Sequence, residues 1–299
     1  MANAKEIRDR IDGIKETQKI TKAMYLISSA KMRKAKEELD KTRPYFNEVQ
    51  GEIKRIFRTA EQVDSKYFYQ DDALSHPDGV FACLVITADK GLAGAYNQNV
   101  LKEANKLLTE HPATKLFVVG EYGRHFFEQI NIPIERSFLY TAQNPTMHRA
   151  REICNVLLSE FISGAVSKIM LIYTDLKNGF ETECKIVRLI PFHKDQFRTR
   201  EHEKAVSVPF EFTPSVSAVL DSIMQSYISG YIYSALVDSF CSEQQARMTA
   251  MDGANRNAEK LLRELSIQYN RVRQSAITMS ITEVSAGAKA QRKKRREVG

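Results

Sequence analysis

The chain has 299 residues, of which 43% are hydrophobic, so it is long and apolar enough to build a substantial core. It contains no tryptophan, and its 13 glycines and 8 prolines are few for an all-β fold and favour long helices. No apolar run approaches the roughly 20 residues of a membrane span, and the charged start does not fit a signal or transit peptide. We therefore expect a protein of the cytosol, or of a cytosolic surface.

The net charge of +7 is concentrated in two places. One is the basic tail, residues 288–299, which holds six basic side chains and one acidic side chain. The other is residues 17–36, a segment without any Asp or Glu. Because the rest of the chain is slightly acidic, the pattern predicts two local basic patches rather than a general affinity for polyanions.

Residues 1–58 are predicted to form one long helix, which Pro44 either ends or bends. Its apolar residues begin with the 4–3 spacing that is typical of a coiled coil. A second apolar line, Ile20, Met24 and Ile27, lies beside the first, so we expect more than one partner to cover this helix. The coiled-coil positions are Ile7, Ile11, Ile14, Gln18, Thr21, Tyr25, Ser28, Met32, Ala35 and Leu39.

The middle of the chain, residues 80–192, alternates apolar strand-like runs with amphipathic helical runs. This alternation predicts a Rossmann-like α/β domain with a largely parallel sheet. Polar segments at 59–79 and 193–213 flank it as a linker and a charged loop. The expected strands are 80–87, 115–120, 168–176 and 180–192, and the expected helices are 97–111, 121–130 and 145–164.

Residues 214–287 carry the strongest periodic signal in the sequence. Starting at Leu220, alternate steps of three and four residues reach Met279 without a slip over eight heptads, with Asn255 as a polar residue in the seam. Such a helix far exceeds the needs of a globular domain. We expect it to pair with the N-terminal helix as a long antiparallel coiled coil.

The stretch KGLAGAYNQN, residues 90–99, resembles a phosphate-binding loop because two glycines follow a strand and precede a helix. It matches neither the P-loop pattern nor the dinucleotide fingerprint, so a tight strand-to-helix turn is the favoured interpretation. No pattern of a nucleophile or a zinc site is present among the Ser, His and Cys residues, and His193 and His202 fall in a charged loop. Cys83 fits a buried strand position. We therefore expect no catalytic site, no cofactor and no metal.

The far end of the C-terminal helix has an unusual surface for a helix in water. Ile281 and Val284 alternate there with Thr278 and Thr282, and β-branched residues are poor helix formers on an exposed face. This surface favours a narrow socket made by other chains.

Three stretches, 7–35, 89–100 and 246–288, resemble signatures of the γ subunits of F-type ATP synthases. The resemblance covers nearly the whole chain. It implies that the two terminal helices form a rotating shaft inside a ring of three α and three β subunits, with the ε subunit and the c-ring beside the central domain. It also implies a non-catalytic rotor on the cytoplasmic face of a bacterial membrane, which couples proton flow to ATP synthesis or hydrolysis.

The resemblance further implies a set of residues that contact partners. Lys90 and Gly91 belong to the glycine loop, which would face acidic loops of the β subunits. Arg247 would couple the position of the shaft to the ring, and Arg273 and Gln274 would bind polar groups of a β subunit. The residues implied to pass the acidic loops are Lys19, Lys22, Met24, Lys31 and Arg33.

Two departures from the family pattern stand out. The basic tail extends past the usual end of the family, either as a solvated segment or as an extra contact with the ring or the δ subunit. The central domain also lacks the inserted cysteine pair of the chloroplast form, so redox control is not expected. Two other readings remain open: a helical scaffold that binds nucleic acid through its tail, and an α/β enzyme with helical arms.

Overall fold

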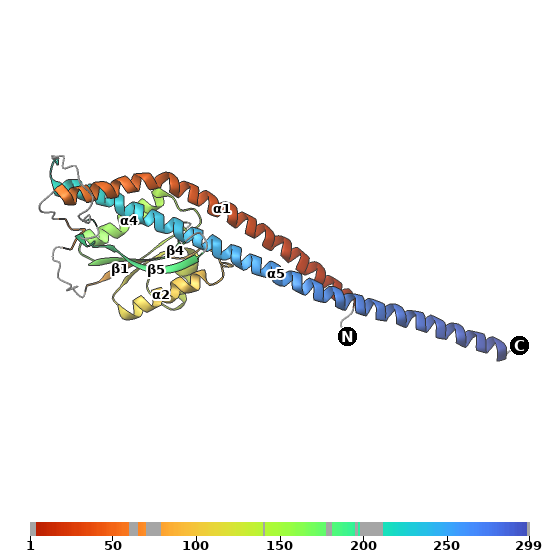
Figure 1. The fold of residues 1–299 in the computed structure, drawn as a ribbon. Helices are drawn as coiled ribbons and strands as arrows, with labels where there is room; N and C mark the ends of the chain where they lie inside the picture. Colours follow the sequence, from red (N-terminus) through yellow and green to blue (C-terminus); the bar gives the residue numbers. More distant parts are fainter. Residues whose placement is uncertain are drawn as a thin grey trace. The chain divides into compact units, whose positions relative to one another are not determined.

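The computed structural model describes residues 4–59, 65–69, 79–139, 141–177, 181–194, 197 and 212–297 (Figure 1). The chain divides into two compact units. The domain unit comprises Ser28–Met248, and the coil unit combines Met1–Ile27 with Thr249–Gly299. Two long helices, α1 (Ala4–Thr59) and α5 (Val216–Glu297), contribute to both units, so each boundary falls inside a helix.

The domain unit is built on a five-stranded sheet in the order β3-β2-β1-β4-β5. Strands β1, β2, β3 and β4 pair in parallel, and β5 joins β4 as an antiparallel edge strand. This arrangement confirms the predicted α/β class and the largely parallel sheet. The strands are β1 (Phe81–Ile86), β2 (Lys115–Val119), β3 (Arg136–Phe138), β4 (Lys168–Lys177) and β5 (Glu181–Ile190).

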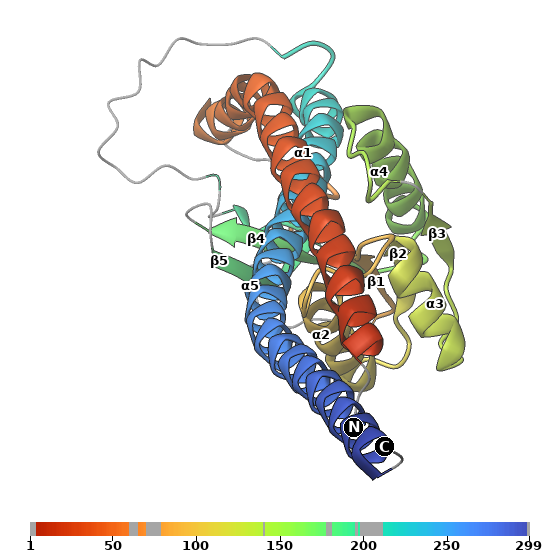
Figure 2. The same cartoon turned by 90° about the vertical axis from the view of Figure 1, so that its right-hand side faces the viewer.

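Helices cover both faces of this sheet (Figures 1 and 2). They are α2 (Tyr96–Glu110), α3 (Glu121–Gln129) and α4 (Met147–Ile162). In β1, Leu84 and Ile86 pack in the core that contains α4, whereas Cys83 and Val85 pack in the core that contains α2 and α3. The alternation of side chains along a strand therefore separates the two cores, and both cores exclude water because every residue of β1 after the first is buried.

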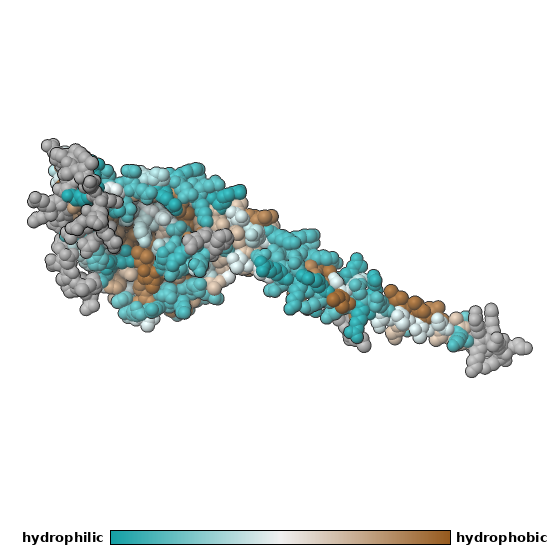
Figure 3. All heavy atoms as spheres, viewed as in Figure 1, coloured by the Kyte–Doolittle hydropathy of each residue, from teal (hydrophilic) through white to brown (hydrophobic). Residues whose placement is uncertain are grey.

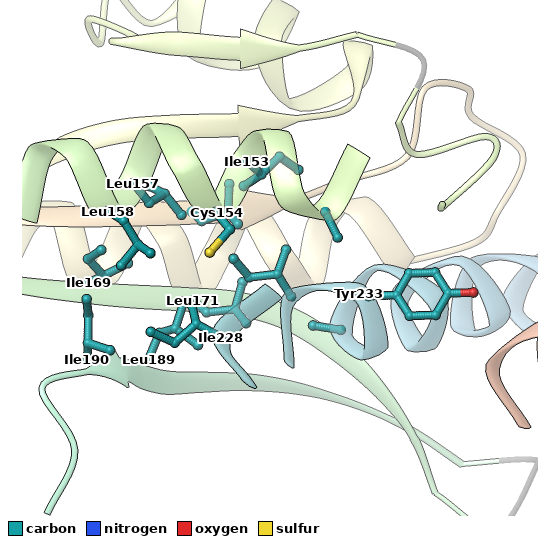
Figure 4. Packing of buried hydrophobic residues seen from close by; sticks show 14 of the residues in the cluster. Ile153, Cys154, Leu157, Leu158, Ile169, Leu171, Leu189, Ile190, Ile228 and Tyr233 are labelled. Atoms are coloured by element: carbon teal, nitrogen blue, oxygen red, sulfur yellow. The ribbon is translucent and has the colours of Figure 1, made fainter. Parts of the chain in front are cut away.

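The first half of α5 belongs to the core of the domain. Figure 4 shows Ile228 of α5 beside Leu171 of β4 and Leu189 of β5, and Tyr233 of α5 belongs to the same cluster of buried residues. Residues 28–59 of α1 pack on the same cluster through Leu39, Ile53 and Ile56. The sequence predicted a coiled-coil seam along this part of α5, but it did not predict that the helix would also cover one face of the sheet.

The coil unit is an antiparallel pair formed by the start of α1 and the second half of α5. Its register is set by polar contacts: Thr21 Oγ1 lies 2.6 Å from Asn255 Oδ1, and Gln18 Nε2 donates to Glu259 Oε1 at 3.5 Å. This pairing confirms the predicted antiparallel coiled coil. The predicted heptad positions of α5 in this unit are all buried or partly buried: Met251, Asn255, Ala258, Leu262, Leu265, Tyr269 and Val272.

Of the two alternatives left open at Pro44, the helix does not end there: Pro44 lies inside α1, and the helix continues for fifteen further residues to Thr59. Proline removes one backbone donor, but the apolar contacts of α1 on both sides of Pro44 outweigh that loss. Helix α5 runs to Glu297, past the predicted end at 287, so the basic tail begins as helix. Most of the predicted linker 59–79 and loop 193–213 lies outside the described residues.

Within the described part of the chain, no helix combines the length and the apolar character that crossing a membrane requires.

Candidate functional site

The glycine loop leaves the carboxyl end of β1 and enters α2. Asn97, which is 5% exposed, accepts a hydrogen bond from the backbone N–H of Ala88 at 2.9 Å and so closes the loop across its base. Gly94 has a φ of +55°, a conformation that glycine adopts without a steric penalty. Ala93 and Tyr96 are buried and pack with Ala88. The loop is therefore a tight turn with fixed ends, as the sequence predicted.

Helix α3 approaches the same end of β1 very closely. A Cβ added at Gly120, whose φ is +97°, would lie 2.3 Å from the carbonyl oxygen of Thr87, and one at Gly123 would lie 2.6 Å from Thr87 Oγ1. Asp89 Oδ1 accepts a hydrogen bond from the backbone N–H of Glu121 at 3.0 Å. A carboxylate of the loop thus binds the N-terminus of α3, where the helix dipole favours negative charge.

The crevice between β1 and β4 is the place where doubly wound sheets bind their ligands, because the covering helices change face there. Here α5 closes the carboxyl end of β4. Ser239 Oγ accepts a hydrogen bond from Thr174 N at 3.2 Å, and Ser242 Oγ donates to Thr174 O at 3.2 Å. Both serines are almost completely buried. Side chains of α5 therefore bind the backbone of β4 near the edge where doubly wound folds bind their ligands.

A buried ion pair joins α5 to the glycine loop. Arg247 Nη2 lies 2.5 Å from Glu243 Oε1 and donates to the carbonyl oxygen of Gly91 at 3.1 Å. Arg247 is 9% exposed and Glu243 is 6% exposed. Burial raises the pKa of the Glu243 carboxyl, and the Arg247 guanidinium opposes that effect. The pair holds the loop against the helix, and either partner alone would be an uncompensated charge.

Two further charges surround this pair. Asp89, at the start of the loop, raises the pKa of Glu243, and Lys31 of α1 lowers it. Lys31, Asp89, Glu243 and Arg247 therefore form a charge cluster that draws on α1, the loop and α5. The sequence prediction included Lys31 and Arg247 but missed Glu243, Asp89 and Asn97. The i, i+4 spacing of Glu243 and Arg247 on one helix was the available signal.

The other predicted contact residues of the domain unit lie at its surface. Lys90 and Gly91 are exposed at the tip of the loop, and Arg33 is exposed on α1, with its Nε 4.0 Å from Glu37 Oε1. The structure thus brings Lys90, Gly91 and Arg247 together in one loop assembly. Arg33 takes no part in the contacts that hold this loop.

The remaining predicted contact residues belong to the coil unit. Lys19 pairs with Glu16 one turn earlier, at 2.7 Å, and this hydrogen bond raises the pKa of the lysine. Lys22 is exposed and Met24 is half-buried. Arg273 and Gln274 are exposed on α5, immediately after Val272, the last residue that the coiled coil partly covers.

Beyond Val272, α5 continues without cover from α1, and every side chain described from 273 to 291 is exposed. Ile277, Ile281 and Val284 form one stripe at i, i+4 and i+7, with exposures between 52% and 70%. Met279, 66% exposed, lies on the opposite side of the helix. Figure 3 shows the apolar patches on this part of α5. A helix with apolar side chains on opposite faces needs partners on more than one side.

Comparison with known proteins gives the family. The family model described as ATP synthase matches residues 3–291. The gamma chain of Caldanaerobacter subterraneus subsp. tengcongensis is 41% identical over 95% of this chain and 98% of its own length. That of Acetivibrio thermocellus is 39% identical over 97% and 99%. This chain belongs to the ATP synthase gamma chain family.

Solved structures of the family agree with the fold. The central stalk of the Tetrahymena thermophila mitochondrial ATP synthase matches with a TM-score of 0.60 and 25% identity, over 79% of this chain and 99% of that chain. A rotor chain of the Euglena gracilis enzyme matches with a TM-score of 0.61 over 92% and 98%, and its 16% identity supports the fold alone. The match to the ATP synthase family model ends at 291, so residues 292–299 extend past it.

The cysteines, the possible metal ligands and one cleft are the other places where chemistry could occur. Cys83, Cys154 and Cys241 are buried free thiols, Cys184 is a half-buried one, and burial raises the pKa of each. No cluster of three or more His, Cys, Asp or Glu residues suited to a metal occurs in the described ranges. A cleft of about 620 Å³ lies at the amino ends of β1 and β4, opposite the edge where doubly wound folds bind ligands.

Proposed function

We propose that this gamma chain family member is the central rotor stalk of an F-type ATP synthase and carries no catalytic site of its own. Its partners would be a ring of three α and three β subunits, the ε subunit and the c-ring. It would lie on the cytoplasmic face of a bacterial cell membrane as a peripheral subunit. Proton flow would turn the c-ring and this chain, and the turning chain would drive ATP synthesis, or run in reverse under ATP hydrolysis.

The observation that carries the proposal is the uncovered end of α5. The coiled coil stops covering α5 at Val272, yet apolar side chains continue on two sides as far as Val284. Exposed apolar surface of this kind marks a protein interface, and its distribution around the helix fits a surrounding sleeve better than a single flat partner. The three-plus-three ring of the family supplies such a sleeve.

The mechanism follows from asymmetry. A shaft made of two unequal helices presents a different surface in each direction, so it contacts three identical β subunits in three different ways. Each contact shifts the equilibrium of that subunit between its nucleotide-binding states by the difference in contact energy. Turning the shaft moves these differences from one subunit to the next. Nucleotide chemistry then remains with the ring.

Two features of the domain unit support a non-catalytic role. Helix α5 fills the crevice at the carboxyl end of β4 through Ser239 and Ser242. The carboxylate of Asp89 accepts a hydrogen bond from a backbone N–H at the N-terminus of α3. Both positions would otherwise suit a phosphate-bearing ligand, so the fold keeps the architecture of a nucleotide-binding domain and uses its binding edge for internal contacts.

The exposed basic residues fit contacts with acidic loops of the ring. Lys22 and Lys90 present their ammonium groups to solvent, whereas Lys19 shares its charge with Glu16. Exposed ion pairs contribute about 0–1 kcal/mol each, so these residues would steer and align the shaft rather than hold it.

A reconstituted complex tests the proposal. The chain, with Cys184→Ala and a labelling cysteine at exposed Lys102 on α2, is assembled with the α and β subunits of its own organism, and a bead on Lys102→Cys is observed under ATP. We expect one-way rotation in threefold steps. Ile281→Asp should shorten the time the shaft stays in the ring, whereas Ile281→Leu, which keeps the apolar surface, should not.

The outcomes separate the alternatives. An assembly that hydrolyses ATP without turning the bead contradicts the rotor mechanism. A chain that forms no assembly and instead binds nucleic acid through residues 289–299 supports the scaffold reading. If the Ile281→Asp and Ile281→Leu chains stay in the ring for the same time, the uncovered end of α5 is not held by an apolar sleeve.

A further inference from the structure

Leu92, at the tip of the glycine loop, combines two unusual properties. Its φ is +63°, in the left-handed region that bulky residues rarely adopt. It is 66% exposed, so internal packing compensates little for the strained backbone. The other non-glycine residue with positive φ in the described part of the chain is Asn131, and asparagine tolerates that conformation well. Leucine has no such tolerance, so its positive φ at this position is not explained by the residue type.

The loop around Leu92 is fixed on both sides. Before it, the carbonyl of Gly91 accepts the hydrogen bond from buried Arg247. After it, Ala93 is 3% exposed and packs with Tyr96. Asn97 closes the base of the loop through the N–H of Ala88. An apolar side chain held outward by a rigid loop needs little further ordering when it binds a partner, which is the main condition for a preorganised contact.

We propose that Leu92 is an apolar anchor that inserts into a small apolar pocket of a ring subunit, where the pocket is bordered by carboxylates. The apolar pocket follows from the exposed leucine, since its burial is favourable only where water is excluded. We infer the carboxylates from Lys90, which is exposed beside Leu92 and would pair with an acidic group of the partner. Arg247 cannot play this part, because Glu243 and the Gly91 carbonyl already bind it inside the chain. This inference rests on the proposed rotor function and names a contact within it.

The structure also assigns a positioning role to Arg247. It does not reach the surface, since only 9% of it is exposed, and its bond to Gly91 fixes the residue that precedes Leu92. Arg247 would therefore act on the ring through Leu92 rather than by direct contact. This differs from the expectation of a direct coupling residue, and it explains why a buried arginine belongs to the loop assembly.

Three variants separate the side chain from the backbone. Leu92→Asn removes the apolar group and suits the left-handed backbone, Leu92→Met keeps an apolar side chain, and Leu139→Asn removes another exposed leucine of the domain unit. Each full-length chain is labelled and assembled with the α and β subunits. Its dissociation rate from the ring is then measured by a chase with unlabelled chain, and its melting temperature is measured alone.

We expect Leu92→Asn to dissociate about tenfold faster or more, as the loss of one buried leucine implies. Leu92→Met and Leu139→Asn should dissociate at nearly the wild-type rate. The isolated Leu92→Asn chain should melt at the same temperature as the wild type or slightly above it, because the strain is relieved. That result also shows that faster dissociation does not reflect a damaged fold.

Two results would overturn the inference. If Leu92→Asn dissociates at the wild-type rate while the wild-type chain assembles and rotates, Leu92 is not an anchor and the rotor function stands. If Leu92→Met and Leu139→Asn dissociate from the ring as fast as Leu92→Asn, the effect is not specific to an apolar group at the loop tip. Failure of the wild-type chain to assemble counts against the rotor function itself.

Discussion

Gly230 of α5 lies directly against the Phe46 ring of α1 in the domain unit. A Cβ added at Gly230 would lie 2.1 Å from Cε1 and 2.2 Å from Cδ1 of the Phe46 ring. Gly51, on α1, is also helical, but a Cβ there would meet nothing within 4 Å. The same substitution to alanine therefore tests close packing at one site and helix propensity alone at the other.

The two substitutions are expected to change the free energy of unfolding in opposite directions. Alanine favours a helix over glycine by about 1 kcal/mol, so Gly51→Ala should stabilise the chain by roughly 0.5–1 kcal/mol. At Gly230 the ring must move by more than an ångström to restore an ordinary contact, and overpacking of this kind costs about 1–3 kcal/mol. After the helix gain, Gly230→Ala should destabilise the chain by about 1 kcal/mol.

Urea denaturation of the isolated chain, followed by circular dichroism, measures both changes. Phe46→Ala provides the control, because removing the ring should turn Gly230→Ala from destabilising to neutral or stabilising. A double-mutant cycle of these two changes isolates the contact between the two helices. Equal stabilisation by Gly230→Ala and Gly51→Ala would refute the close-packing explanation.

Three further predictions concern charge and reactivity. Burial and nearby Asp175 raise the pKa of Asp238 from 3.8 to about 6, so ionisation disfavours the folded state and its penalty grows as the pH rises from about 4 to 7. Asp238→Asn should therefore stabilise the chain by about 2–3 kcal/mol at pH 8 but little at pH 4, and an equal gain at both pH values in urea denaturation would contradict this. Glu243→Gln leaves Arg247 without its counter-charge and should cost about 3 kcal/mol in the same assay, and a neutral result would show that the pair is not needed for stability. Cys184 should react first with a thiol reagent in the native chain, because the other three cysteines are buried, and simultaneous labelling of all four would indicate local opening.

The two periodicities of the sequence predicted much of the fold. The heptad positions of the C-terminal helix match the covered side of α5 from Met251 to Val272, because both partners of that seam repeat with the same period. The cover stops where the helix pair ends, so Ala276 and Met279 occupy seam positions without a partner. Periodicity identifies an apolar side but does not say how far the partner helix reaches.

The role of the first half of α5 was harder to predict. From Ile228 to Cys241 its residues are buried on nearly all sides, by α1 on one side and by the sheet and α4 on others. The heptad spacing accounts for one side only. Small residues such as Gly230 and Ser239 between the apolar ones were the signal that other elements pack closely, since a helix without a polar face is surrounded. The three-residue strand β3 gave no periodic signal at all.

The glycine loop shows a different limit. The sequence identified a tight turn, and Asn97 and Gly94 account for that turn in the structure. It did not show that Arg247 is buried against this loop, because the Gly91 carbonyl that binds Arg247 is 156 residues away in sequence, and without that burial Glu243 is only one more i, i+4 partner on a helix. Contacts between distant segments follow from the fold, and a single sequence carries no direct record of them.

In the proposed function this chain works through contacts with other chains, so its functional residues would differ from those of an enzyme. An enzyme concentrates buried groups with displaced pKa values in a cleft, whereas the carboxylates with raised pKa in this chain, half-buried Asp238 and buried Glu243, lie on α5 where it packs in the domain unit. Its candidate contact residues are unusual because, in the isolated chain, they have a strained backbone or expose apolar surface to water. Leu92 is strained and exposed, and Ile281 is apolar and uncovered on a helix without a partner. In the proposed assembly each would be covered by a partner, so the burial of these residues would supply free energy for coupling to the ring.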